Sequence, residues 1–367
     1  MRIGIDCRLV LDKPTGIGTY ILGLLRDLLR LDGDNDYVLI VRDRVPEALK
    51  AIAGPSARFA RCPLPPMGPK QKLLAARYLR PLRLDVYHYP HHDLPFGLEE
   101  RTVVTIHHLP EPGISTGPAK IFNPLLVGSI GWAVARARRT IAVSHYTARK
   151  LIERFGHAER IIPIYPPPSD LLDEREEAPL PPGIRAGSYF LFVGQRRPHK
   201  NLVRLLRAFA TPELRPYQLV LSGPPYRGYR EPEQWVAELG LADRVFLLGT
   251  TEPSLLRSLY RNALCLVVPS LLEGFGYPVA EALHFGLAIV SSDRGSLPEI
   301  VGDAGLIVDP LSTEALAEAM IRIAREPELR QTLRERALDR SSLFSGERSA
   351  RSVLEVYREV AEMAGSA

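Results

Sequence analysis

The chain has 367 residues, 46% of them hydrophobic and 24% charged, with a formal net charge of +5. This composition is ordinary for a globular protein, and the length suits two domains of about 150–180 residues better than a single core. No run approaches the roughly 20 apolar residues of a membrane-spanning helix, and the opening MRIGIDCRLV predicts a buried strand rather than a signal peptide, so we expect a cytoplasmic protein.

Short apolar runs alternate with amphipathic stretches along most of the chain. The runs lack strict alternation, which predicts parallel strands covered on both faces, and stretches such as Tyr20–Leu31, Leu202–Phe209 and Pro278–Phe285 predict the intervening helices. This order predicts two doubly wound α/β domains. The expected strands are Ile3–Ile5, Tyr37–Val41, Val86–Tyr89, Val103–Ile106, Thr140–Val143, Tyr189–Val193, Gln218–Ser222, Val245–Leu248, Leu264–Val268, Ala288–Ser291 and Gly305–Val308.

One proline-rich, acidic stretch interrupts this pattern. PIYPPPSDLLDEREEAPLPPG resists both helix and sheet and therefore predicts a linker. We expect a first domain over residues 1–165, a linker over 166–185, a second domain over 186–345 and a last helix, 346–367, that crosses back to the first domain.

The distribution of charge suggests the kind of ligand that the first half faces, and the cysteine content argues against two kinds of site. Residues 1–165 carry 24 Lys+Arg and 15 Asp+Glu, a net +9, and the remaining residues carry 23 and 27, a net −4. The first half is therefore expected to face something anionic, such as phospholipid, a phosphorylated acceptor or nucleic acid. The three cysteines lie far apart and fit neither a zinc site nor a disulfide framework.

Two strand ends in the first half carry candidate ligand contacts. In TGIGT, Gly16 and Gly18 stand before a predicted helix, where backbone N–H groups can approach a phosphate. A dinucleotide fingerprint needs a third glycine where Ile21 stands, so an NAD site is disfavoured and a plain glycine turn remains the alternative. In VTIHH, His107 can either hydrogen-bond a sugar hydroxyl or serve the structure.

HYPHH, which contains His88, His91 and His92, forms a further cluster at a strand end. Read as metal ligands, these histidines are taken to lack a carboxylate or cysteine partner nearby in sequence, so we expect pocket lining or simple packing rather than a metal site.

Two segments in the second half concentrate charge where strands end. VGQRRPHKN contains Arg196 and Lys200, and Lys200 is the only lysine after Lys150, which suits a diphosphate contact, although an exposed turn is the alternative. In PSLLEGFGYPVAEALHFG, a loop carries Glu273 and the first turn of the next helix is expected to carry Glu281. Two carboxylates at that spacing can reach two hydroxyl-bearing groups, such as a sugar and a ribose.

These segments together resemble the family 4 glycosyltransferases. EGFGYPVAE resembles the family's Glu-x₇-Glu motif, and TGIGTY, VTIHH, AVSHYTARKL and LPEIVGDAGLIVDP resemble its other characteristic segments in the family's order. The chain is similar in particular to the bacterial subgroup that often uses GDP-mannose to build surface polysaccharide. The resemblance implies the GT-B fold, an α/β architecture with two Rossmann-like doubly wound parallel-sheet domains facing an interdomain cleft.

The resemblance also implies roles for individual residues. Glu273 would hold hydroxyls of the transferred sugar, Glu281 the nucleotide ribose, and Lys200 the diphosphate. The Gly16–Gly18 loop would close over the reaction centre, and His107 would lie beside the sugar. The implied donor-binding set is Gly16, Gly18, Arg196, Lys200, Glu273, Gly274, Phe275, Gly276, Tyr277 and Glu281, and the implied catalytic set is Glu273, His107, Lys200 and Arg196.

Two positions depart from the family pattern. Gln195 stands where many members have an arginine, so Arg196 is the substitute that we expect at the diphosphate. His108 replaces the aspartate that usually follows the family histidine.

The function implied is a retaining, metal-independent hexosyltransferase without a cofactor beyond its nucleotide-sugar donor. The expected acceptor is a glycan or a lipid-linked glycan. The basic amphipathic segment Met67–Arg83 can lie on an anionic membrane at the inner face, which suits a lipid-linked acceptor; the alternative for this segment is a solvated helix.

A nucleotide-sugar epimerase and a catalytically silent sugar-nucleotide-binding protein are the alternative functions. No motif supports nucleic-acid binding.

Overall fold

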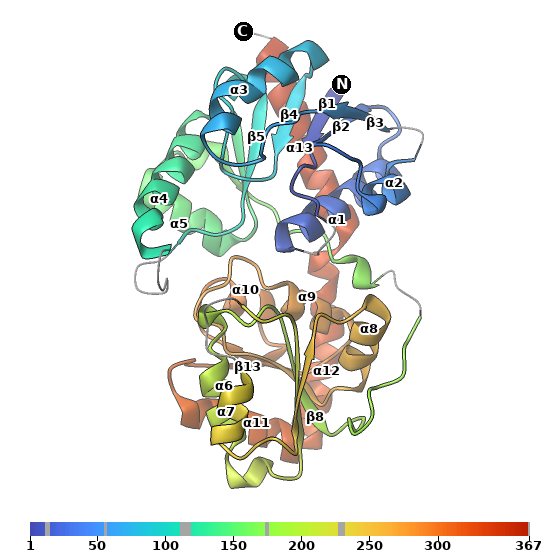
Figure 1. Ribbon diagram of the computed structural model, residues 1–367, viewed down its shortest axis with the longest axis vertical. Helices are drawn as coiled ribbons and strands as arrows, with labels where there is room; N and C mark the ends of the chain where they lie inside the picture. The colour runs from blue at the N-terminus through green and yellow to red at the C-terminus, as the bar shows by residue number, and fades with distance from the viewer. Residues whose placement is uncertain (12–14, 55–56, 111–118, 173–175, 227–231, 366–367) are drawn as a thin grey trace. The chain divides into compact units, whose positions relative to one another are not determined.

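The computed structural model describes residues 1–11, 15–54, 57–110, 119–172, 176–226 and 232–365 (Figure 1). These residues form two compact units. Unit 1 contains the described residues up to Ser169 and those from Phe344 onward, and unit 2 contains Asp170–Leu343.

Unit 1 is built on a seven-stranded parallel sheet with the order β3-β2-β1-β4-β5-β6-β7. The strand order reverses between β1 and β4, and ligands of such sheets bind beyond the carboxyl ends of the strands at this point. The strands are β1 Arg2–Asp6, β2 Asp36–Val41, β3 Ala57–Arg61, β4 Val86–Tyr89, β5 Thr102–Ile106, β6 Arg139–Ala142 and β7 Ile161–Pro163.

Helices cover both faces of this sheet (Figure 1). Apolar side chains of α1, α2 and α13 form one buried cluster with β1 and β2, and those of α3, α4 and α5 form two clusters on the opposite face. The helices are α1 Gly16–Leu31, α2 Glu47–Ala53, α3 Pro69–Leu79, α4 Ala119–Arg136, α5 His145–Phe155 and α13 Gly346–Gly365.

The last helix, α13, is part of unit 1 although it follows unit 2 in the chain. Its Tyr357 is fully buried, and the hydroxyl lies 2.6 Å from Nδ1 of His88 on β4. The other ring nitrogen of His88 lies 2.8 Å from the Thr105 hydroxyl on β5. His88 is therefore a core histidine that joins the sheet to α13.

Unit 2 repeats the same topology with a six-stranded parallel sheet, in the order β10-β9-β8-β11-β12-β13. Its strand order reverses between β8 and β11. The strands are β8 Tyr189–Val193, β9 Gln218–Ser222, β10 Val245–Gly249, β11 Cys265–Val268, β12 Ile289–Ser292 and β13 Gly305–Val308.

The helices of unit 2 also lie on both faces of its sheet (Figure 1). Helices α6, α7 and α11 contribute to one large buried cluster with the sheet, which Leu333 of α12 joins, and α9 packs against both α10 and α12. The helices are α6 Leu202–Phe209, α7 Pro232–Glu238, α8 Pro253–Asn262, α9 Tyr277–His284, α10 Leu297–Val301, α11 Thr313–Arg325 and α12 Pro327–Ser341.

The structure differs from the sequence predictions at several boundaries. Strands β3 and β7 were not predicted. Helix α1 begins at Gly16, so the expected glycine loop is the first turn of a helix. The second part of the expected linker packs on unit 2, where the Ser258 hydroxyl donates to Ala178 O at 2.6 Å and the Gln218 amide donates to Gly183 O at 2.7 Å.

Candidate active site

Lys200 and Glu273 meet at the carboxyl ends of β8 and β11, where the strand order of unit 2 reverses. Lys200 ends a short helical turn, Pro198–Lys200, after β8, and its ammonium donates to Oε1 of Glu273 at 2.5 Å. The two side chains are only 14% and 12% exposed. Burial alone would raise the pKa of Glu273, but the Lys200 charge and hydrogen bond lower it below its ordinary value. The site therefore holds a charged pair at neutral pH.

The loop that carries Glu273 is fixed by the turn before α10. Ser296 donates its backbone N–H to Glu273 O at 3.1 Å and its hydroxyl to Phe275 O at 2.9 Å. Gly295 has a φ of +64°, and a Cβ there would lie 2.5 Å from Glu273 O. Only glycine allows this approach without displacing the loop, so the GSLPEIV segment supports the glutamate that it follows.

Arg196 joins two loops at the carboxyl end of the sheet of unit 2. Its side chain is almost fully buried, Nε donates to Gly223 O at 3.1 Å and Nη1 to Glu233 at 3.2 Å. Gly223 itself has a positive φ, and a Cβ there would clash with the Gly194 carbonyl. Arg196 thus ties the loop after β8 to the loop after β9, and its contact with the diphosphate stays a prediction.

Glu281 is held by a tyrosine that the sequence did not single out. The carboxylate is 8% exposed and accepts a 2.7 Å hydrogen bond from the Tyr260 hydroxyl of α8. The Tyr260 ring stacks on Phe285, with centroids 5.3 Å apart and an interplanar angle of 7°. Burial and the neighbouring carboxylate raise the pKa of Tyr260 far above its ordinary value, so this hydroxyl remains a donor.

Helix α9 begins one residue earlier than expected, at Tyr277, with Pro278 in its first turn. Glu281 therefore lies in the second turn, not the first. Gly276 precedes the helix with a φ of +97°, and Phe275 is buried with its ring 5.4 Å from that of Tyr277. The GFG run thus leads directly into a helix start.

The candidate residues of unit 1 lie at the carboxyl ends of β1, β4 and β5. Gly16 and Gly18 occupy the first turn of α1, capped by the Thr15 hydroxyl, which accepts from Gly18 N–H at 3.0 Å. Nε2 of His107 donates to Pro90 O at 3.0 Å, and its ring packs edge-on against Tyr20 at 5.2 Å. Burial lowers the pKa of His107 to about 3, so the imidazole is neutral with its proton on Nε2.

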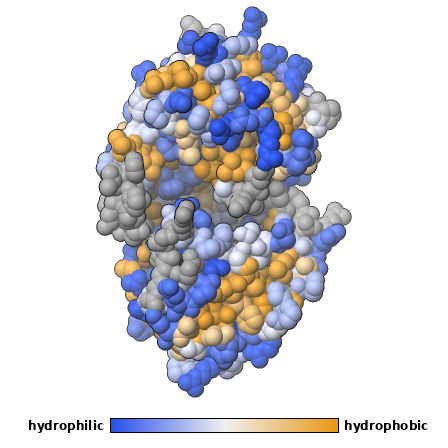
Figure 2. Space-filling view, in the orientation of Figure 1, coloured by the Kyte–Doolittle hydropathy of each residue, from blue (hydrophilic) through white to orange (hydrophobic). Residues whose placement is uncertain are grey.

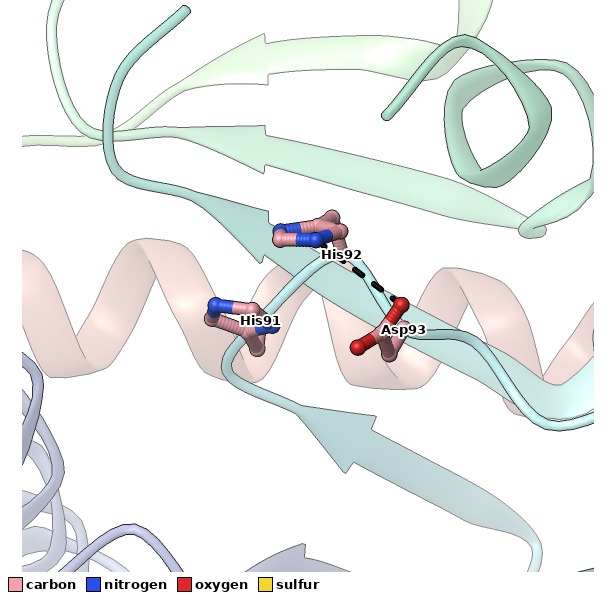
Figure 3. Close-up of side chains that lie close together, drawn as sticks. All are labelled: His91, His92 and Asp93. Atoms are coloured by element: carbon pink, nitrogen blue, oxygen red, sulfur yellow. Dashed lines mark ion pairs between the residues drawn. The ribbon is translucent and has the colours of Figure 1, made fainter. Parts of the chain in front are cut away.

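The loop after β4 brings His91 and His92 together with a carboxylate that the sequence interpretation overlooked (Figure 3). This carboxylate is Asp93, the next residue. One possible ligand atom from each of the three residues lies within 4.8 Å of the other two. His88 is not part of the group, because both its ring nitrogens bond within the core.

The two units therefore place different groups at equivalent ends of their sheets. Unit 2 offers an ammonium, two carboxylates and the start of α9, which suits a ligand with hydroxyl groups and a diphosphate. Unit 1 offers neutral imidazoles and the start of α1. Sequence reasoning missed Tyr260 and Ser296 because each acts through a neighbour rather than through a motif of its own. It also overlooked Asp93, although Asp93 directly follows His91 and His92 in the chain.

Comparisons with known proteins agree with this arrangement. Residues 14–168 match the family described as Glycosyltransferase Family 4, and residues 181–340 match the glycosyl transferases group 1. O-antigen chain mannosyltransferase B of Escherichia coli is 30% identical over 296 residues, which are 76% of this chain and 76% of that protein.

Solved structures share the fold over nearly the whole length. Sucrose-phosphate synthase from Thermosynechococcus elongatus has a TM-score of 0.79 at 20% identity and covers 98% of both chains. HepE from Anabaena, in complex with UDP and glucose, has a TM-score of 0.76 at 19% identity and covers 98% of this chain and 100% of that one. The expected GT-B architecture is thereby confirmed.

Proposed function

Because the chain belongs to the family 4 glycosyltransferases, we propose that it transfers a hexose from a nucleotide diphosphate donor to a glycan or lipid-linked acceptor in the synthesis of cell-surface polysaccharide. Mannose from GDP-mannose is the donor that we propose first, since the Escherichia coli relative is an O-antigen chain mannosyltransferase. The observation that carries the proposal is the partly buried Lys200–Glu273 pair, whose glutamate lies in the loop that leads into α9.

Lys200 is proposed to stabilise the leaving diphosphate. Bond cleavage at the anomeric carbon leaves negative charge on the phosphate, and a preorganised cation in a water-poor site stabilises that charge more than water does. Lys200 is 14% exposed and already oriented by Glu273. This charge compensation needs no metal ion.

Glu273 and Glu281 are proposed as hydroxyl-binding groups rather than as nucleophile or acid. Glu273 is ionised and paired with a cation, which makes it an acceptor for sugar hydroxyls and a poor proton donor. Glu281, oriented by Tyr260, would accept from the ribose. We propose that transfer retains the anomeric configuration, with the leaving phosphate receiving the acceptor proton.

The decisive experiment is an assay of the purified chain against a panel of GDP- and UDP-sugars, with free nucleotide and product glycan both measured. We expect one donor to be consumed only when a glycan acceptor is present, with or without EDTA. Free nucleotide without product would indicate hydrolysis, epimerised donor without free nucleotide would indicate an epimerase, and binding without either would indicate a silent binder.

Variants at the charged pair connect this activity to the site. Glu273→Gln and Lys200→Met should each lower kcat/KM by at least about a hundredfold, because each removes a group placed for the transition state. Lys150 and Glu153 form an exposed pair at 3.0 Å, so Lys150→Met and Glu153→Gln are matched controls and should retain activity. Near-normal turnover in both site variants would contradict the assigned roles.

We also propose that α3 rests on an anionic membrane at the cytoplasmic face. No described helix has the length and apolarity to span a bilayer. Exposed Leu73, Leu74 and Tyr78 project from α3 among basic residues, and Figure 2 shows hydrophobic residues beside hydrophilic ones over this helix. Apolar side chains with surrounding cations are the combination that binds anionic bilayers.

Vesicle sedimentation tests the membrane contact. The chain should bind vesicles that contain anionic phospholipid, more weakly at high salt, and Leu73→Ser with Leu74→Ser should weaken binding. Leu311→Ser, an equally exposed leucine of unit 2, is the control. Equal binding to neutral vesicles, or no effect of the α3 variants, would contradict the contact.

A further inference from the structure

The loop after β4 presents two imidazoles and a carboxylate from consecutive residues, His91, His92 and Asp93 (Figure 3). The rings of the two histidines lie 3.9 Å apart with an interplanar angle of 37°. In the part of the chain that the structure describes, this is the one group of three or more such side chains whose ligand atoms converge.

We propose that these three residues form a zinc-binding site, with one ring nitrogen from each histidine and one carboxylate oxygen from Asp93 as ligands. Two imidazoles and a carboxylate are a ligand set that Zn²⁺ uses in proteins, and three protein ligands leave a fourth position for water or for an oxygen atom of a substrate. Two nitrogen ligands suit zinc better than Mg²⁺ or Ca²⁺, which prefer oxygen.

A buried polar atom of His91 also needs a partner. Nδ1 of His91 is buried and has no hydrogen-bond partner among the residues that the structure describes. A buried polar atom without a partner destabilises the folded state, and a metal ion at the loop would remove that cost if Nδ1 is the ligating atom.

The carboxylate of Asp93 is held by groups that commonly surround a ligating carboxylate. Gly68 N–H donates to Oδ2 at 2.9 Å and the Ser129 hydroxyl donates to Oδ1 at 3.0 Å. Such outer contacts orient metal ligands.

The ammonium of Lys72 would compete with a metal ion for the carboxylate of Asp93. Its ammonium lies 3.4 Å from Oδ1 of Asp93. It also donates to the Ser129 hydroxyl at 2.6 Å and lies 5.7 Å from the Trp132 ring centre. Lys72 therefore keeps other partners if a metal ion takes the carboxylate, and removing its charge should strengthen metal binding.

Titration of the full chain with Zn²⁺, followed by calorimetry and by competition with a chromophoric chelator, tests the site. We expect one Zn²⁺ per chain, no comparable binding of Mg²⁺, and visible d–d absorption when Co²⁺ replaces Zn²⁺. His91→Ala, His92→Ala and Asp93→Asn should each weaken Zn²⁺ binding about tenfold or more, whereas Lys72→Met should tighten it by roughly tenfold. Circular dichroism confirms that each variant is folded.

The control is His157→Asn, which removes an exposed histidine of unit 1 and keeps a residue suited to its φ of +60°. This variant should bind Zn²⁺ as the parent chain does. Absence of stoichiometric Zn²⁺ binding, or binding that survives unchanged in the folded His91→Ala and His92→Ala variants, would overturn the proposal. Because binding is measured directly, either result leaves the proposed transfer reaction untouched.

Discussion

The two units share one topology but place different sets of polar groups at the carboxyl ends of their strands. Unit 2 holds the ionised pair Lys200 and Glu273. Unit 1 holds three histidines that burial keeps neutral, next to the carboxylate of Asp93; the histidines are His91, His92 and His107. The strand order therefore determines where a ligand can bind, and the residues in the loops determine the charge of that binding site. The proposed binding of a diphosphate rests on the ionised pair of unit 2.

The largest expected effect is on the free energy of unfolding, and it distinguishes a closely packed glycine of unit 2, Gly295, from an unpacked one of unit 1, Gly16. Gly295→Ala should destabilise unit 2 by more than about 2 kcal/mol, because φ is positive and the new Cβ meets Glu273 O at 2.5 Å. Among the described residues, a Cβ on Gly16 meets no atom within 4 Å, so Gly16→Ala should leave unit 1 as stable as before or slightly more stable. Urea unfolding measures both.

The result for Gly16→Ala also tests the expected donor contact. Unchanged stability with reduced transfer would support a role of the α1 start in catalysis. A Gly295→Ala chain as stable as the parent would show that the close approach of Gly295 to the Glu273 loop does not constrain unit 2.

Mild acid should weaken unit 1 before unit 2. Four histidines of unit 1, His88, His91, His92 and His107, have pKa values of about 3 to 4, chiefly through burial, against about 6.5 in an unfolded chain. Below pH about 6.5 these histidines bind protons in the unfolded chain but not in folded unit 1. The free energy of unfolding of unit 1 should therefore decrease as the pH falls from 6.5 towards 4. In unit 2, the lowered pKa of Glu273 reduces the free energy of unfolding only when the pH falls below about 4.3, the ordinary pKa of a glutamate.

The two tryptophans allow this prediction to be measured unit by unit, since Trp132 lies in α4 and Trp235 in α7. In Trp235→Phe, fluorescence reports unit 1, and its urea midpoint should fall between pH 7 and pH 5. In Trp132→Phe, fluorescence reports unit 2, and the midpoint should change less. Equal shifts of both midpoints would contradict the proposed difference.

The smallest expected effect is a change in nucleotide affinity on substitution of Tyr260. Tyr260→Phe keeps the stacking on Phe285 but removes the hydrogen bond to Glu281, so nucleotide affinity should fall about fivefold, equivalent to roughly 1 kcal/mol, with kcat little changed. Tyr217→Phe, which removes a hydroxyl bonded to Ala324 O, is the control. If Glu281→Gln weakens nucleotide binding and Tyr260→Phe does not, Glu281 needs no orienting hydroxyl.

Much of the fold was predictable from sequence because most strands are buried on both faces and read as apolar runs. The two strands that were missed, β3 and β7, are the outermost strands of their sheet. The sequence of β3, ARFAR, contains two arginines among five residues and is partly exposed, and β7 has three residues and ends in Pro163. These two strands lack the longer apolar run that identified the others, including the outer strands β10 and β13 of the second sheet.

The site was predictable only in part. The motif EGFGYPVAE located Glu273 and Glu281, and the scarcity of lysine drew attention to Lys200. The packing of Arg196 against Gly223 and Glu233 could not be read from VGQRRPHKN, because Glu233 is 37 residues away in the chain. Asp93 was adjacent to its histidines and was nonetheless overlooked.

The most direct test of the central claim is the affinity of the full chain for GDP and UDP, each compared with its monophosphate. The account predicts that the chain binds the preferred diphosphate more tightly than the monophosphate, that Lys200→Met loses about tenfold or more of that preference, and that Lys150→Met keeps it. A Lys200→Met chain that binds diphosphate and monophosphate in the same ratio as the parent would contradict the assignment of the diphosphate to this pair.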